Sequence, residues 1–320
     1  MNKTCLLCPR RCGVYRDAGF RGYCGETSEL RLVFAGIHRG EEPAITGGGG
    51  SGTVFVSGCN LGCIFCQNYQ ITKKGEGRIV STEEFAEICL ALQEKEAENI
   101  NIVTGTHAAP ALARGITAAR KQGLFIPTVW NSSGYEGPET LAILKDFVDV
   151  YMPDLKTMDV RLAEKFYKTP DYPEYATEAI LKMMDFRETR FGPGREDGVD
   201  VLVSGVLVRH LVIPGFLEDT WQVLRWFADH CKSRAFLALM TQYTPVYHPG
   251  SKTETPDRFL SEGEYEAVLF MLRRLGIEEG YCQELVTGSD WLPDFTRQNP
   301  FSSELSIPVW HYLTTFCRGQ

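Results

Sequence analysis

The sequence has no apolar run that approaches the about 18 residues needed to span a membrane. Its first five residues carry no apolar core like that of a secretory signal. Histidine is scarce, with 6 in 320 residues, and basic residues are outnumbered by acidic ones, which gives a net charge of −8. These absences argue against a membrane protein, a secreted protein and a general nucleic-acid binder. We therefore expect a cytoplasmic protein with neither a membrane nor a nucleic acid as partner.

Cysteine, by contrast, is abundant, with 11 in the chain. Without a secretory signal, so many cysteines fit a reducing compartment better than a disulfide framework. Four of them cluster near the N-terminus, three cluster around residue 60, and four are scattered. The scattered ones are expected to be small buried side chains; they are Cys89, Cys231, Cys282 and Cys317.

The cluster of three has the most informative spacing in the chain. Cys59, Cys63 and Cys66 form a Cys-x3-Cys-x2-Cys motif, with Phe65 just before the last cysteine. Three such thiolates can hold three irons of a cubic iron–sulfur cluster and leave the fourth iron without a protein ligand. The alternative is a structural zinc site, which needs a fourth ligand, and the next cysteine, Cys89, lies in a helix-like stretch. The spacing favours a cluster with an open iron.

The cluster of four makes a complete set of thiolate ligands, namely Cys5, Cys8, Cys12 and Cys24. Such a set can close around zinc or around a second [4Fe–4S] cluster, and the sequence does not choose between them. Because four protein ligands leave no open position, we expect this site to be structural or to relay electrons. The segment has too little apolar content to fold alone, so bound metal would be part of its folding energy.

From residue 53 onward, strand-like and helix-like segments alternate. The expected strands are 53–56, 99–103, 124–130, 148–152, 206–213 and 235–240, and the expected helices are 83–94, 108–121, 139–145, 160–168, 174–188, 220–229 and 261–275. Strands separated by helices predict a parallel sheet with right-handed crossovers. Six such units are too few for a closed eight-stranded barrel. The pattern predicts an α/β fold of the open, TIM-like (β/α)6 type.

The chain divides into three expected parts. Residues 1–52 form the four-cysteine module and its linker, 53–275 form the barrel, and 276–320 form a C-terminal extension that packs on the barrel. The glycine-rich run 47–52 is either a flexible linker or a tight backbone path under the cluster. The polar stretch 191–198 is expected to be a mobile loop.

Polar residues stand at the carboxyl ends of the expected strands, where barrels of this kind carry their chemistry. Asp154 and Lys156 follow the fourth strand and point to one face of the chain, although an ordinary surface ion pair is the alternative. Arg209 and His210 interrupt an apolar strand, so at least one should face a polar barrel interior unless they form a buried structural pair. The remaining candidates at strand ends are Thr104, Gly105, Thr106, His107, Asn131 and Gln242.

The cysteine spacing, Phe65 and the preceding strand resemble the radical S-adenosylmethionine (SAM) superfamily. The resemblance implies that SAM chelates the open iron, and that one electron from the reduced cluster releases a 5′-deoxyadenosyl radical that abstracts hydrogen from a C–H bond. An electron donor such as flavodoxin or ferredoxin is implied as a partner. Phe65 would lean against the adenine, unless it is an ordinary core aromatic. SAM or substrate contacts are implied for Thr104, Gly105, Thr106, His107, Asn131, Asp154, Lys156, Arg209, His210 and Gln242. His107 could instead cap the following helix, and Asn131 could instead belong to a plain turn.

A narrower resemblance is carried by Cys-Leu-Leu-Cys-Pro-Arg-Arg-Cys, Cys-Gln-Asn-Tyr, Asn-Ser-Ser-Gly-Tyr-Glu and Tyr-Met-Pro-Asp-Leu-Lys. These segments resemble proteins labelled pyruvate formate-lyase activating enzyme-like, and Asp154-x-Lys156 resembles a motif of enzymes that activate glycyl radical enzymes. Two substrate classes follow: a glycine in a partner protein, or a peptide side chain or small metabolite. An iron–sulfur electron carrier without SAM chemistry and a zinc-stabilised binding module remain the alternatives of another class.

Overall fold

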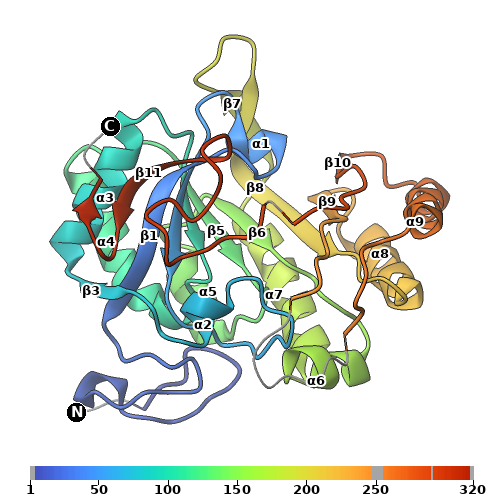
Figure 1. Cartoon of the computed structure of the whole chain (residues 1–320), viewed down its shortest axis with the longest axis horizontal. Coiled ribbons are helices and arrows are strands. Elements are labelled where there is room, and N and C mark those ends of the chain that lie inside the picture. The colour runs from blue at the N-terminus through green and yellow to red at the C-terminus, as the bar shows by residue number, and fades with distance from the viewer. Residues whose placement is uncertain (1–3, 247–254, 290, 318–320) are drawn as a thin grey trace.

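One twelve-stranded, mostly parallel sheet forms the centre of the molecule in the computed structural model, which describes residues 4–246, 255–289 and 291–317 (Figure 1). Its six main parallel strands lie side by side, and the sheet does not close on itself. These strands are β2 (Ser51–Val56), β4 (Ile100–Val103), β5 (Thr128–Ser132), β6 (Val150–Pro153), β8 (Asp200–Leu211) and β9 (Phe236–Met240). The predicted α/β fold with an open (β/α)6 barrel is confirmed.

Helices connect these strands and cover the outer face of the sheet. They are α3 (Thr82–Glu94), α4 (Ala109–Lys121), α5 (Pro138–Leu144), α6 (Val160–Tyr167), α7 (Tyr172–Phe186), α8 (Leu217–His230) and α9 (Glu262–Leu275). The hydroxyl of Ser81 caps α3 by accepting from the Glu84 N–H, and Ser261 opens α9 with a capping box. Outward-facing strand residues such as Val54 and Ile102 pack in one apolar core with these helices. In the described part of the chain no helix has the length and apolarity to cross a membrane.

Three expected elements differ from the structure. The fifth expected strand, 206–213, begins earlier, because β8 runs over Asp200–Leu211. The stretch 191–198 is not simply a loop, because β7 (Arg190–Pro193) pairs antiparallel with the start of β8 and forms a hairpin with it. The third expected strand, 124–130, begins only at Thr128 as β5. Phe125 is 74% exposed and Pro127 has no N–H to donate to a neighbouring strand, so the residues before Thr128 lead into the sheet from outside.

The glycine-rich run 47–52 is a tight backbone path and not a free linker. The Gly49 N–H donates to Glu98 Oε1 (2.9 Å), and the run leads directly into the first residues of β2. The cysteine motif follows the opposite end of that strand, so the expectation that the run passes under the cluster is wrong. Next to it, Ala44 and Ile45 of α1 (Pro43–Thr46) pack on Val129 and Val150 inside the barrel. Helix α1 therefore plugs the amino-terminal end of the barrel.

The C-terminal segment adds a strand next to each of two distant strands of the open sheet, β9 and β1 (Leu30–His38). Strand β10 (Gly280–Cys282) pairs with β9, whereas β11 (Ser306–His311) pairs with β1, which also pairs with β2 and β3 (Arg78–Val80). The two-residue β12 (Thr315–Phe316) pairs antiparallel with β11. Between β10 and β11, Phe295 and Phe301 are buried against Phe55 and Val103. Those side chains alternate with the outward ones of β2 and β4, so the segment crosses the inner face of the sheet (Figure 1, red).

Close packing of α3 on α4 gives a stability prediction. A methyl group added at Gly115 would lie 2.1 Å from Cδ1 of the Phe85 ring, which is fully buried. We expect Gly115→Ala to lower the free energy of unfolding by about 1–3 kcal/mol through overpacking. Gly263, in the first turn of α9, has no atom near its added methyl, so Gly263→Ala should raise it by up to about 1 kcal/mol. Anaerobic urea unfolding measures both; an unchanged Gly115→Ala protein would contradict this helix contact.

Candidate active site

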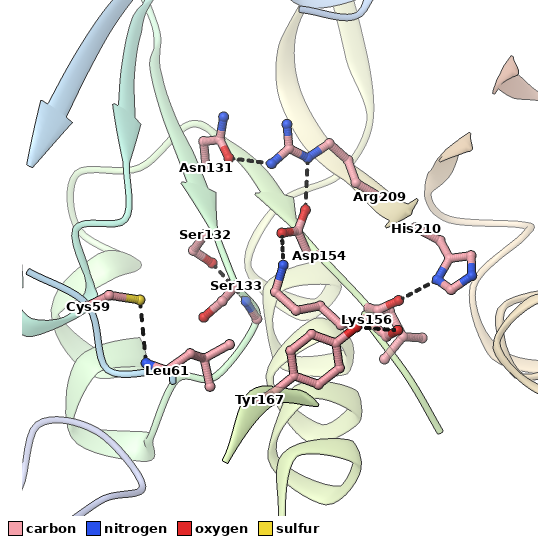
Figure 2. Close-up of polar contacts among 12 residues, drawn as sticks. Cys59, Leu61, Asn131, Ser132, Ser133, Asp154, Lys156, Tyr167, Arg209 and His210 are labelled. Atoms are coloured by element: carbon pink, nitrogen blue, oxygen red, sulfur yellow. Dashed lines mark hydrogen bonds and ion pairs between the residues drawn. The ribbon is translucent and has the colours of Figure 1, made fainter. Parts of the chain in front are cut away.

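The three-cysteine motif lies in a loop that is held at several points. Leaving β2, the loop is fixed to the end of α6 by two backbone bonds, from Gly62 N–H to Tyr167 O (3.0 Å) and from Ile64 N–H to Phe166 O (2.9 Å). The Leu61 N–H points to Cys59 Sγ at 3.4 Å (Figure 2). The loop is therefore ordered by the barrel at the carboxyl end of β2, where the fold predicts the chemistry.

The three thiols lie close to one another, and all three cysteines are partly buried. Burial, together with the neighbouring thiols, raises the pKa of Cys59 to about 12 and that of Cys63 to about 11, while Lys156 opposes the shift at Cys63. Cys66 Sγ lies 3.3 Å from the hydroxyl of Thr72. With their pKa values raised, the thiols of Cys59 and Cys63 become thiolates only beside a positive charge, which bound iron would supply.

The donor set fits a cluster by its chemistry. Within the described ranges, no three His, Cys, Asp or Glu side chains converge as ligands of a single metal ion would. A cubic cluster does not require that convergence, because each of its thiolates binds a different iron. Cys59, Cys63 and Cys66 thus offer three partly buried sulfurs in one loop, a donor set of the kind that leaves one iron open.

A chain of charged side chains runs through the barrel toward this loop (Figure 2). Asp154 stands at its centre: Oδ1 accepts from Arg209 Nε (3.0 Å) and Oδ2 accepts from Lys156 Nζ (2.5 Å). On its other side, the Arg209 guanidinium donates to Asn131 Oδ1 (2.6 Å) and to Glu41 Oε2 (3.3 Å). The chain of contacts leads from Glu41 through Arg209 and Asp154 to Lys156, the cation that acts on Cys63.

The electrostatics of this chain keep its central members charged. Burial alone would raise the pKa of Asp154, but Lys156 and Arg209 outweigh burial and hold that pKa below its ordinary value. Burial would lower the pKa of Lys156, yet Asp154 and Cys63 hold it above its ordinary value. An ammonium held in place beside a carboxylate, near the cluster loop, can bind an anionic group of a ligand while the carboxylate faces a cationic one.

Several candidates from the strand ends lie around the same opening. The Thr104 N–H donates to Asn131 O (2.9 Å) from a left-handed backbone with φ = 61°. Thr106 donates to Glu136 Oε1 (2.9 Å), and Gly105 packs against Trp130, where a methyl group would come within 2.7 Å of the ring. These residues share one end of the barrel, where their hydrogen bonds and packing contacts are to other residues of the protein.

Phe65 lies in an aromatic cluster. Its ring contacts those of Phe166, Tyr167 and Tyr243 at centroid distances of 5.9, 5.8 and 5.6 Å. The side chain is 7% exposed, so it serves the apolar core in this structure. The cluster forms an apolar wall directly beside Cys63, which also packs on it.

Three candidates point away from the charged chain. Both ring nitrogens of His210 are engaged outside it, with Leu155 O (2.8 Å) and Thr220 Oγ1 (3.1 Å), and Figure 2 shows the ring turned from Asp154. His107 Nε2 lies 2.7 Å from Ser57 O at the root of the cysteine loop. Gln242 Oε1 accepts from Gln283 (2.8 Å) in the C-terminal segment. Their bonds in this structure hold loops and strands together.

Two buried carboxylates that sequence reasoning did not assign to the site belong to it. Glu41 precedes α1 and reaches Arg209, Asn101 and Asn131 inside the barrel; burial raises its pKa, which Arg209 opposes. Glu136 accepts from Thr106 and Trp130, and burial raises its pKa as well. Glu136 is the last residue of the Asn-Ser-Ser-Gly-Tyr-Glu segment, so the sequence offered a signal that could have assigned it to the site. No sequence motif pointed to Glu41.

The four N-terminal cysteines also lie close together. Burial, with smaller contributions from the thiols of Cys24, Cys5 and Cys12, raises the pKa of Cys8 to about 11. A methyl group at Gly22 would lie 2.9 Å from Cys12 Sγ and 3.8 Å from Cys24 Sγ, so glycine leaves the space between these two sulfurs open. The four thiols lie in one small region of the module, although they do not converge on a point as the ligands of a single metal ion would.

This N-terminal module packs directly on the cysteine loop of the barrel (Figure 1, dark blue). The Cys59 N–H donates to Cys24 O (3.3 Å), which joins a cysteine of one cluster to a cysteine of the other through a backbone bond. Arg16 donates to His107 O (2.5 Å) and to the carbonyls of Glu26 and Thr27. The module is therefore a wall of the candidate site.

Comparison with known proteins agrees with this geometry. Residues 53–227 match the family described as the radical SAM superfamily. An uncharacterised protein of Methanocaldococcus jannaschii is 28% identical over 285 residues, which cover 86% of this chain and 76% of that protein. Among solved structures, the FeFe-hydrogenase maturase HydG from Carboxydothermus hydrogenoformans superposes with a TM-score of 0.50 at 12% identity, covering 77% of this chain and 60% of that chain. A second HydG crystal structure gives 0.50 at 14% identity and 72% and 50% coverage.

The likeness to HydG concerns the fold alone, and this chain spans only half to three fifths of those longer proteins. The family match covers more than half of the chain and begins at the strand that leads into the three-cysteine motif. A [4Fe–4S] cluster and SAM are the groups that this family implies, and the residues at the end of β2 fit the cluster. The chain belongs to the radical SAM superfamily.

Proposed function

We propose that this protein reductively cleaves SAM at a [4Fe–4S] cluster held by Cys59, Cys63 and Cys66, and uses the resulting 5′-deoxyadenosyl radical to abstract hydrogen from a substrate. The observation that carries the proposal is the juxtaposition of three partly buried thiols with the Asp154–Lys156 pair at the carboxyl end of the barrel. When bound, the cluster and SAM together supply the electron and the radical. The chain's own residues bind, orient and exclude water.

SAM carries an ammonium and a carboxylate on its methionine part and an apolar purine at its other end. Lys156 is a cation that acts on Cys63, and Asp154 and Asn131 offer oxygens in the same chain of contacts. We propose that these residues, with Arg209 behind them, orient the methionine part. The aromatic cluster around Phe65 supports a role as the wall for adenine. Further contacts are proposed from the neighbouring strand ends: Thr104, Gly105, Thr106, His107, His210 and Gln242.

Two substrate classes are proposed, and each has one feature in its favour. The Asp154-x-Lys156 arrangement resembles that of activating enzymes, whose target is a glycine of a partner protein. The C-terminal segment, which covers part of the inner face of the barrel with Phe295 and Phe301, favours a smaller substrate such as a metabolite or a peptide. Deuterium transfer into 5′-deoxyadenosine from a substrate labelled at the candidate carbon separates the two classes.

The N-terminal module, proposed as residues 1–52, is assigned a metal at Cys5, Cys8, Cys12 and Cys24, either zinc or a second [4Fe–4S] cluster. The barrel is proposed as residues 53–275 and the extension as 276–320. All eleven cysteines are free, which supports a reducing, cytoplasmic setting, and a flavodoxin or ferredoxin is the proposed electron donor. Iron, sulfide and zinc analysis of anaerobically purified protein distinguishes about four irons with one zinc from about eight irons.

The test of the proposed function is product formation. Protein reduced with dithionite in the presence of SAM should yield 5′-deoxyadenosine and methionine, measured by liquid chromatography and mass spectrometry. The same protein without reductant is the control and should yield neither. A reducible, iron-loaded protein that forms no 5′-deoxyadenosine would instead support the electron-carrier alternative, and an iron-free protein would support the zinc-stabilised binding module.

A further inference from the structure

An arginine of the N-terminal module is inserted between the module and the catalytic cysteine loop. Arg10 lies in the Cys8-Pro-Arg-Arg-Cys12 segment and is half-buried. Its Nε donates to Asn60 O (3.0 Å), and Asn60 directly follows Cys59. Its Nη2 donates to the hydroxyl of Thr169 (2.7 Å), just after α6. Arg10 thus joins three separate segments at one point beside the loop.

Aromatic rings complete the site around this guanidinium. It lies over the ring of Tyr23 at 3.8 Å from the centroid and 5.8 Å from that of Tyr135. The Tyr23 hydroxyl in turn sits against the loop, because a methyl group at Gly62 would lie 2.6 Å from it. The loop's Asn60 is fixed as well, by donating to Tyr135 O (2.7 Å). The position of the charge relative to the loop is therefore well defined.

Arg10 forms no direct ion pair with a carboxylate in the part of the chain that the structure describes. None of the ion pairs found among residues 4–246, 255–289 and 291–317 includes Arg10, whereas its neighbour Arg11 pairs with Glu139. Its hydrogen bonds go to a carbonyl and a hydroxyl, and its stacking partners are neutral rings. A guanidinium cannot lose its proton in a protein, so the positive charge is permanent.

We infer that Arg10 is a positioning residue whose charge raises the reduction potential of the cluster on Cys59, Cys63 and Cys66. One electron passes from the reductant to the cluster, and the reduced cluster is the more negative of its two states. A fixed positive charge in a partly desolvated place stabilises that state more than the oxidised one. The inference rests on the proposed function, because it needs a redox-active cluster at this loop. It also gives the N-terminal module a part in the reaction, through a side chain and independently of which metal the module holds.

The experiment is an anaerobic redox titration followed by electron paramagnetic resonance, using the reduced signal that changes when SAM is added. Arg10→Gln should shift the midpoint potential of that signal to more negative values, and Arg10→Lys, which keeps the charge, should leave it close to wild type. Arg225→Gln on α8 removes an exposed arginine and serves as the control. An unshifted Arg10→Gln protein, or equal shifts in Arg10→Gln and Arg10→Lys, would overturn the inference.

A second pair of variants leaves Arg10 in place. Thr169→Asp puts a carboxylate against Nη2 and compensates the charge, whereas Thr169→Asn has nearly the same shape and does not. The potential should be more negative in Thr169→Asp than in Thr169→Asn, and equal potentials would contradict the inference even if Arg10→Gln fails to retain iron. Failure of the proposed function looks different, since wild-type protein would then show no signal that responds to SAM.

Discussion

Replacing Cys63 by alanine is expected to abolish the catalytic cluster and all SAM cleavage. Two thiolates remain, which is too few to hold a cubic cluster in a site built for three. Iron content should fall by about four per chain relative to wild type, while any metal at the N-terminal module stays. Iron and sulfide analysis, together with 5′-deoxyadenosine formation in the presence of dithionite, measures the effect.

The matched control is Cys89→Ala. Cys89 is a buried thiol in α3, inside the apolar core and away from both cysteine clusters. Its replacement removes one sulfur atom from the core and should leave iron content and SAM cleavage intact. Product formation that survives in Cys63→Ala, or is lost in Cys89→Ala, would contradict the assignment of the cluster ligands.

Replacing Asp154 by asparagine is expected to have the second largest effect. The carboxylate bridges Lys156 and Arg209 inside the barrel, and its removal leaves two adjacent buried cations without their shared counter-charge. We expect the free energy of unfolding to fall by about 3 kcal/mol, since breaking a buried pair on one side strands the partner. SAM cleavage should fall by about 100-fold, because Lys156 loses the contact that orients it.

Asp185→Asn tests whether these effects are specific to the barrel interior. Asp185 also pairs with an arginine, Arg234 (3.0 Å), but both side chains are about half exposed. Its loss should change stability by less than about 0.5 kcal/mol and leave activity unchanged. If Asp154→Asn and Asp185→Asn behaved alike in urea unfolding and in SAM cleavage, the charged chain in the barrel would have no specific role in stability or activity.

The architecture was accessible from sequence because its signals are local. Alternating apolar strands and amphipathic helices predict the parallel sheet, and the strand-end rule selects Asn131, Asp154 and Lys156, which the structure brings together with Arg209. The sequence did not predict the hairpin of β7 and β8, because the segment Phe191-Gly-Pro-Gly has the composition of a turn. The residues of β7 become a strand only because they pair with β8. Tertiary pairing decided against local preference there.

The finer geometry depended on information that no short segment carries. Arg209 and His210 are adjacent on β8, so their side chains face opposite sides of the sheet and only one can enter the barrel. The register puts Arg209 inside and His210 against α8. Glu41 lies more than 160 residues from its partner Arg209, and the contact exists only because α1 plugs the barrel. The contact of the N-terminal module with the cysteine loop is of the same long-range kind.

The central claim is that SAM binds at a cluster on Cys59, Cys63 and Cys66. The most direct measurement is the electron paramagnetic resonance spectrum of the reduced, anaerobic protein, recorded before and after SAM is added. The account predicts a [4Fe–4S] signal in wild type that changes shape with SAM, and that is missing in Cys63→Ala. A cluster signal that SAM leaves unchanged, or one that persists and still responds to SAM in Cys63→Ala, would contradict it.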